Sequence, residues 1–451
     1  MDDRTSFPFG PLNRLVYRRV VVPAQDFIRT EVAGGVVILV AAVAALIWAN
    51  VDSSYFEFWG TELSFDIKIA HDTNSLKGWV NDGLMVLFFF VIGLEIKREL
   101  LHGELNSPRK AALPIAAAAG GMIVPALIYV AFNAGGEGAG GWGIPMATDI
   151  AFALGVLALV GKGIPPPLRI FLLALAVADD VGAILVIAVF YTESLDLVWL
   201  GVGGWLIAMI LMMQRFDIRQ INPYWVVGGA LWLAFLESGV HPTIAGVILG
   251  VLTPASAYIR PKRFADEADS LIRDWKEADE RGEQPTSEAL LGQLEELTTS
   301  AEAPLERLER SLVRWTSFVV VPIFALANSG IDLSGGVIGD ATTSDVTAGV
   351  LLGLLAGKVV GVIGTTWIAT RVGIGELPPG VTWIQIVGVG LLAGIGFTVA
   401  LFITELAFDD NEVLATNAKI GILCASVVAG LLGYMFLKLS TRGAASEAAV
   451  E

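Results

Sequence analysis

Residues 172–190 read LLALAVADDVGAILVIAVF, a stretch in which Asp179 and Asp180 are the only polar side chains. An apolar run of this length can cross the hydrocarbon core of a membrane as one helix. A carboxylate at that depth costs about 2.5–3.5 kcal/mol on the insertion scale, so such residues mark functional sites. The stretch therefore predicts a membrane-spanning helix whose carboxylates handle cations or protons, although a purely structural carboxylate pair is the alternative.

A third carboxylate lies in another apolar stretch, MATDIAFALG (146–155), which follows GGWGIP (140–145). The glycines and the proline would permit an interrupted helix, and a carboxylate can offset the positive end of a half-helix. Asp149, together with Thr148, is therefore either an ion ligand or electrostatic support for a broken helix. The sequence leaves both interpretations open.

The composition of the chain is that of a membrane protein. Of its 451 residues, 55% are hydrophobic and 16% are charged, and the mean hydropathy is +0.68. Soluble domains carry about 25% charged residues, so a soluble enzyme is excluded. The single cysteine, Cys424, permits no intrachain disulfide. The charged residues 1–31 do not resemble a signal peptide.

Apolar windows predict an all-α polytopic membrane protein with twelve spans. The predicted spans are 30–49, 78–96, 111–132, 141–161, 168–191, 197–214, 222–236, 240–257, 313–330, 348–370, 383–407 and 415–437. Lys and Arg gather in alternate loops, which predicts that both termini lie in the cytoplasm.

The remaining segments complete the expected domain organisation. Residues 1–29 form a cytoplasmic N-terminus, 258–312 an acidic cytoplasmic insert that is partly helical and partly disordered, and 440–451 a disordered tail. Spans 1–8 occupy 30–257 and spans 9–12 occupy 313–439. Residues 54–70 alternate around Trp59-Gly60-Thr61 and predict an outer β-hairpin. Its edge would pair with a second copy in a homodimer, or the hairpin folds onto its own chain.

Two further features extend the predicted site. Lys358 lies at mid-span depth in LLGLLAGKVVGVIG (351–364) and is the expected counter-charge of the aspartates, the alternative being a lysine that reaches the membrane surface. The glycines of GLLAGIGFTVALF (390–402) predict a second broken helix, the alternative being tight packing of an unbroken one. Spans 3–5 and 10–12 would then form inverted repeats, each with a discontinuous middle helix.

Adjacent positions on a helix differ in direction by about 100°, so Asp179 and Asp180 cannot face one point. One carboxylate would face an ion path and the other would pair with a neighbouring helix. A carboxylate that binds either a proton or a hard cation, but not both, is the minimal device for exchanging the two.

Charged residues near the ends of spans are candidates for a response to pH. Glu95 and Glu99 share a helix face in GLEIKREL (93–100), where Lys97 and Arg98 are either anchors at the membrane surface or parts of an acidic funnel. His241 precedes Pro242 and is either a pH sensor or a hydrogen-bonded packing residue.

Six motifs occur in order: GLEIKREL (93–100), ATDIAFALG (147–155), ADDVGAI (178–184), SGVHPTIAG (238–246), FALANSG (324–330) and GIGFT (394–398). Through them the chain resembles NhaA-type bacterial sodium/proton antiporters over about 25–257 and 304–440. Inverted repeats with broken helices are a known property of that family. The resemblance implies an electrogenic exchanger of the inner membrane that expels Na⁺ and Li⁺ against more than one proton, with no cofactor and no nucleic-acid partner.

The same resemblance implies roles for individual residues. Na⁺ and protons would compete for Asp180, with Asp179 as its neighbour and the partner of Lys358, and with Asp149 and Thr148 at the broken helix. Glu95, Arg98, Glu99, Arg307 and Glu309 match the family's pH-response region, to which His241 adds a candidate. The chain departs from the family in its long 258–303 insert, and in Arg310 and Val313, where familiar members carry histidines.

Two other functions remain alternatives. A sodium-coupled organic-anion symporter needs a substrate pocket with arginine or aromatic contacts in the membrane, and the sequence offers only Lys358 there. An intramembrane aspartyl protease needs two carboxylates from separate helices that share a proton, which Asp149 and Asp180 formally provide. Lys358 beside such a dyad would keep it ionised.

Overall fold

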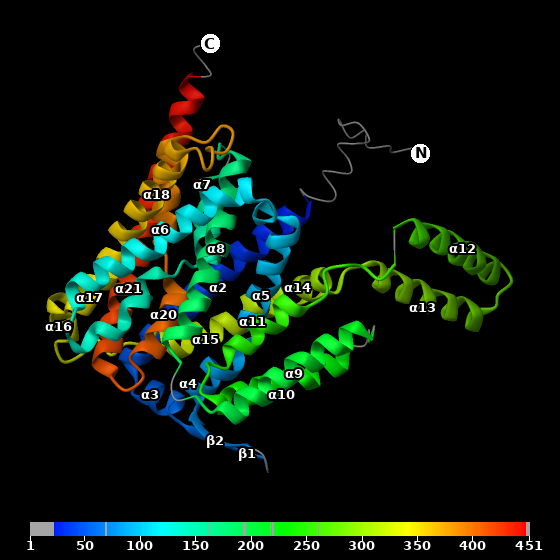
Figure 1. The fold of residues 1–451 in the computed structure, drawn as a ribbon, viewed down its shortest axis with the longest axis horizontal. Helices are drawn as coiled ribbons and strands as arrows, with labels where there is room; N and C mark the ends of the chain where they lie inside the picture. Colours follow the sequence, from blue (N-terminus) through cyan, green and yellow to red (C-terminus); the bar gives the residue numbers. More distant parts are fainter. Residues whose placement is uncertain are drawn as a thin grey trace.

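The computed structural model describes residues 22–67, 70–161, 163–192, 195–216, 218, 221–259 and 261–447. Only the backbone is described at 22–32, 65–67, 70–72, 221, 261 and 442–447. Apart from one two-stranded sheet, the described chain is built from helices (Figure 1). This is the expected result for a bilayer, because a helix satisfies all of its backbone polar groups internally.

The N-terminal half contains α2 (Val22–Val51), α3 (Ser54–Trp59), β1 (Glu62–Ile67), β2 (Ala70–Ser75), α4 (Leu76–Trp79), α5 (Met85–His102), α6 (Pro108–Asn133), α7 (Ile150–Val160), α8 (Pro166–Phe190), α9 (Leu197–Arg215), α10 (Ile221–Ser238) and α11 (Thr243–Leu252). The C-terminal half contains α12 (Pro261–Glu280), α13 (Gln284–Ala301), α14 (Pro304–Trp315), α15 (Val321–Asn328), α16 (Val337–Thr343), α17 (Asp345–Leu352), α18 (Lys358–Val372), α19 (Trp383–Ala393), α20 (Phe397–Ala407) and α21 (Glu412–Glu447).

The prediction of an all-α polytopic membrane protein is confirmed. Within the described residues, eight helical segments are long and apolar enough to cross a membrane, or up to ten if each of two bent pairs is one span. The predicted spans 222–236 and 240–257 coincide with α10 and α11, of which α11 has only 10 residues. The count of twelve therefore stays a prediction.

Both predicted helix breaks are present. The 3₁₀ helix Glu137–Met146 and α7 meet at an angle of 44°, and α19 and α20 meet at 43°. Each broken pair lies between two long spans in the chain, α6 and α8 in one case and α17–α18 and α21 in the other. The two predicted repeats thus share one pattern of long, broken and long helices.

The β-hairpin exists, but its predicted position is wrong. Residues 54–59 form helix α3, because Tyr55 and Trp59 are four residues apart and both are buried on one helix face. The strands are β1 and β2, antiparallel from Glu62↔Ser75 to Ile67↔Ala70. The turn between them lies outside the described residues. We call the end of the molecule with α3, the hairpin and α4 the hairpin end (Figure 1).

The 258–312 insert contains helices α12 and α13, which agrees with the predicted helical part. The two helices pack against each other, and Ala278 and Leu297 are buried. Disorder in the rest of the insert stays a prediction. Span 9 also begins earlier than 313, because amphipathic α14 buries Leu305 and Val313 and continues into α15. We call the end of the bundle that carries this insert the insert end.

The termini differ from prediction as well. Helix α2 begins at Val22, inside the segment expected to precede the first span. Helix α21 continues to Glu447, into the segment from residue 440 that was expected to follow the last span. Residues 1–21 and 448–451 lie outside the described residues.

Candidate functional site at the crossing of two broken helices

The three aspartates converge where the two broken helices meet. Asp179 and Asp180 lie in the middle of α8, and Asp149 immediately precedes α7. All three are buried, with exposed fractions of 1%, 5% and 3% respectively. Burial of an ionisable side chain requires compensation, so the contacts of each carboxylate indicate its role.

Asp149 is bound to the N-termini of two half-helices. One of its oxygens accepts a hydrogen bond from the N–H of Phe152, 3.1 Å away, at the start of α7. The other accepts from Thr398 at the start of α20, through the N–H at 3.1 Å and the hydroxyl at 2.5 Å. Helix N-termini carry unpaired N–H groups and a partial positive charge. Both oxygens of Asp149 are therefore used to close the two breaks.

The backbones of the two breaks are also joined directly. The Asp149 N–H donates to the carbonyl of Ile395, 2.6 Å away, and the Thr148 hydroxyl donates to the carbonyl of Ala393 at 2.8 Å. Thr148 is completely buried, so its hydroxyl needs this acceptor. Thr148 thus connects the two breaks.

Lys358 compensates the partial negative charge at the C-terminal end of a half-helix, whereas Asp149 compensates the positive N-terminal ends. Its completely buried amino group forms an ion pair with Asp179 at 2.6 Å and donates to the carbonyl of Met146. Met146 ends the first half of its broken helix, where carbonyl groups are unpaired and the partial charge is negative. A π-helical turn, Gly353–Gly357, directly precedes Lys358 and is a local deviation often found at functional sites.

Asp180 differs from the other two aspartates. Within the described chain its side chain makes no hydrogen bond and no ion pair. One oxygen of its neighbour Asp179, Oδ1, is also buried without a hydrogen-bond partner among the described residues. The crossing thus combines two satisfied charges, Asp149 and Lys358, with carboxylate oxygens that remain open to a ligand.

Of the pH-response candidates, Glu95, Arg98 and Glu99 lie on α5, and Arg307 and Glu309 lie on α14. Arg98 forms an ion pair with the buried Glu309, which links α5 to α14. Glu99 accepts from the N–H of Glu104 at 2.7 Å and so closes the turn after α5. Glu95 is buried on α5, and its charge acts on Asp180.

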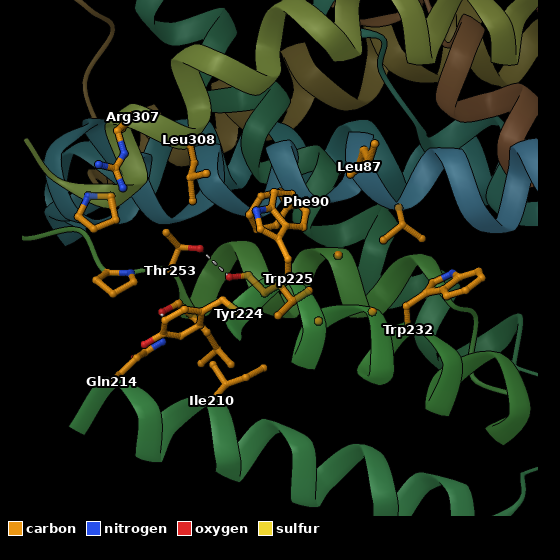
Figure 2. Close-up of a pocket in the computed structure, with 18 of the residues that line it drawn as sticks. Leu87, Phe90, Ile210, Gln214, Tyr224, Trp225, Trp232, Thr253, Arg307 and Leu308 are labelled. Atoms are coloured by element: carbon orange, nitrogen blue, oxygen red, sulfur yellow. Dashed lines mark hydrogen bonds between the residues drawn. The ribbon is translucent and has the colours of Figure 1, made fainter. Parts of the chain in front are cut away.

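Arg307 points elsewhere. It lies at one end of an apolar crevice of about 290 Å³ that also contacts Phe90, Trp225 and Trp232 (Figure 2). None of the residues at the helix crossing lines this crevice. Arg307 is therefore not part of the arrangement that surrounds the aspartates.

His241 lies between α10 and α11. Its Nδ1 is 2.7 Å from the Thr243 hydroxyl, its Nε2 is 3.5 Å from Asp82, and its ring packs edge-on against Phe402. These contacts are those of a hydrogen-bonded packing residue, which was one of the two interpretations of this histidine.

Sequence reasoning missed a second group of buried charges. Glu405, near the end of α20, forms ion pairs with Lys419 on α21 at 2.7 Å and with Lys77 on α4. Glu405 and Lys419 lie near the ends of the predicted spans 383–407 and 415–437, so a search for charges inside apolar windows could have identified them. Thr398 was also missed, because only the crossing brings it to Asp149.

The chain matches the family model described as Na⁺/H⁺ antiporter 1 over residues 25–437. It is 44% identical over 438 residues to the Na(+)/H(+) antiporter NhaA of Oleidesulfovibrio alaskensis, which covers 96% of this chain and 97% of that protein. The Na(+)/H(+) antiporter NhaA 2 of Syntrophotalea carbinolica is 46% identical over 425 residues, with 92% and 96% covered. The NhaA of Rhodopirellula baltica is 41% identical over 440 residues, with 96% of each chain covered.

These matches include both broken helices and all of the residues at their crossing. The similarity therefore extends over the candidate site as well as over the membrane spans. The chain belongs to the Na⁺/H⁺ antiporter 1 family.

Proposed function

We propose that this chain exchanges Na⁺ for H⁺ and that the two ions compete for Asp180. A member of this family is a secondary transporter and not an enzyme. The observation that carries the assignment to Asp180 is that this buried carboxylate has no partner in the described chain, whereas Asp149 and Lys358 are fully engaged. A hard cation prefers oxygen ligands, which this carboxylate and the open oxygen of Asp179 supply.

The neighbouring charges affect how Asp180 binds Na⁺ and protons. Na⁺ bound at Asp180 would lie beside the Asp179–Lys358 ion pair and would be repelled by the charge of Lys358. Protonation of Asp180 removes the charge that attracts the cation, so each ion expels the other. We propose that Asp149 keeps the two half-helices in position and does not itself bind the ion, because its oxygens already accept three hydrogen bonds.

The decisive experiment compares wild type with Asp180→Asn in proteoliposomes by pH-dependent ²²Na⁺ exchange. Asparagine has nearly the same shape but cannot release a proton, so exchange should fall to the level of protein-free liposomes while the protein still folds. Asp340→Asn, at an exposed position on α16, is the matched control and should exchange as wild type does. Retention of exchange in Asp180→Asn would overturn the assignment.

Several finer properties belong to the same proposal. Exchange is electrogenic and includes Li⁺, with more than one proton per ion, and it serves sodium and pH homeostasis in the inner membrane. The distribution of Lys and Arg supports cytoplasmic termini. The strands β1 and β2 support a homodimer, because each has an edge that can pair with another copy. Deletion of residues 62–75 should then give monomers by mass photometry.

The two alternative functions find no support in the relatives, which are named as Na⁺/H⁺ antiporters. A protease dyad would also require Asp149 and Asp180 to share a proton. The oxygens of Asp149 instead accept hydrogen bonds from Phe152 and Thr398. That arrangement leaves Asp149 unsuited to the protease chemistry.

A further inference from the structure

The second group of buried charges includes Glu405 on α20, the half-helix that begins at the candidate site. Helix α20 begins at the crossing, where Thr398 binds Asp149, and runs toward the end of the molecule with α3 and α4 (Figure 1). Its last turns contain Glu405. A displacement at the Glu405 end of this short, stiff helix is therefore transmitted to Asp149.

Glu405 is shared between two lysines on different elements. One oxygen pairs with Lys419 of α21 at 2.7 Å, and the other pairs with Lys77 of α4. Lys419 is buried, whereas about a third of the Lys77 side chain, 31%, is exposed. If Lys77 moves away, Glu405 keeps one buried partner, and Lys77 can be hydrated.

The two lysines also differ in how their helices pack. Helix α20 packs along α21, so Glu405 and Lys419 belong to one packed unit. Lys77 lies at the start of the span that continues into α5, where Phe89 contacts Phe402 of α20. Phe402 is completely buried and also contacts Phe324 of α15. The seam between α20 and the spans containing α5 and α15 thus includes aromatic contacts and the Lys77–Glu405 ion pair.

We propose that Lys77 and Glu405 are positioning residues for the exchange reaction: their ion pair holds α20 in the state closed toward the hairpin end. An antiporter must expose its ion site to the two sides in turn, so this seam has to open once in each cycle. Opening breaks the Lys77–Glu405 pair, and Lys419 then retains Glu405, so that no buried carboxylate is left without a counter-charge. This inference rests on the proposed exchange function.

The first test cross-links each ion pair reversibly in a Cys424→Ala background, because Cys424 is exposed and is the single native cysteine. A short bis-methanethiosulfonate reagent joins Lys77→Cys to Glu405→Cys in one variant, and Glu405→Cys to Lys419→Cys in the other. Both variants lack Glu405, so they are matched for the loss of its charge. We expect the first cross-link to stop ²²Na⁺ exchange until a reductant is added, and the second to leave exchange unchanged.

Exchange that persists through a complete Lys77–Glu405 cross-link would show that the seam does not open, and equal arrest by both cross-links would show that the positioning role is wrong. Absence of exchange in the Cys424→Ala parent would instead count against the proposed function.

A second test avoids the loss of Glu405. Lys77→Gln weakens the closed state but leaves the Glu405–Lys419 pair. Because apparent affinity scales with the population of the binding-competent state, KM for Na⁺ should fall at the hairpin end and rise at the insert end. KM at each end is measured separately in vesicles that hold the protein in one or the other orientation. Lys77→Arg should restore both KM values. A change of KM in the same direction on both sides, or none, would contradict the proposal.

Discussion

Thr398 donates both its backbone N–H and its hydroxyl to one oxygen of Asp149, at 3.1 and 2.5 Å, while the other oxygen caps α7 through Phe152. A single carboxylate therefore fixes the start of two half-helices that are far apart in the sequence. The open carboxylate, Asp180, lies beside a scaffold whose own charges are already matched.

The first prediction concerns this contact. Asp149→Asn replaces one acceptor oxygen by an N–H₂ group, which leaves a buried donor without a partner and should cost about 1–3 kcal/mol. Thr398→Val removes only the hydroxyl donor and should cost about 1 kcal/mol. We expect the thermal midpoint in detergent to fall more for Asp149→Asn, with little change in KM for Na⁺. A large rise in KM at an unchanged midpoint would identify Asp149 as an ion ligand.

A second prediction concerns the helix that carries Lys358. A Cβ at Gly361 would overlap the backbone of Gly120 on α6, so these helices touch along their backbones. Gly361→Ala should force the two helices apart and lower the free energy of unfolding by about 1–3 kcal/mol. It should also displace Lys358, which lies one helical turn before Gly361. Gly364→Ala on the same helix faces open space and is the control, with an unchanged or slightly raised thermal midpoint. Equal midpoints for the two variants would contradict this interpretation.

A third prediction is a pH dependence in the loop after α20. Partial burial, together with Asp410 and Glu405, raises the pKa of Asp409 above its usual range, and Lys77 offsets part of this effect. Because the folded protein holds this proton more tightly than the unfolded chain, Asp409 destabilises the fold as pH rises through its pKa. Asp409→Asn should therefore stabilise at pH 7, by less than about 1 kcal/mol because the side chain is largely solvated.

The stabilisation by Asp409→Asn should disappear below about pH 4, where the wild-type carboxyl is protonated in both states. Thermal midpoints between about pH 3 and pH 8 measure this difference. A gain that is independent of pH would show that the charge of Asp409 is not its cause.

A fourth prediction tests the pH-response region. The Arg98–Glu309 pair joins α5, which carries Glu95, to α14. Glu309→Gln should shift the pH of half-maximal exchange, because it removes a buried charge from this link. Arg310→Gln disrupts the more exposed pair with Glu302 at 2.6 Å and should leave the pH profile unchanged. Identical profiles for both variants and wild type would exclude the Arg98–Glu309 pair from the pH response.

Much of the architecture could be predicted because it depends on local properties of the chain. The apolar run around Asp179 and Asp180 predicted a membrane span, and the glycines at 394 and 396 favoured a helix break over an unbroken helix; the structure contains both the span and the break. The prediction from local patterns was wrong where one segment fits both the two-residue period of a strand and the period of a helix. Residues 54–59 alternate like a strand, yet Tyr55 and Trp59 also share a helix face, and burial of that face produced α3.

The sequence by itself determined that these carboxylates and Lys358 lie inside apolar segments, because hydropathy is a property of a segment. Only the tertiary structure decided which of these charges are satisfied. Asp149 and Thr398 are 249 positions apart, and Lys358 and Asp179 are 179 apart. No local pattern predicts such contacts. Asp180, which the family resemblance already implied as the exchange site, is the carboxylate at the crossing that the fold leaves without a partner in the described chain, whereas Asp149 and Lys358 found theirs.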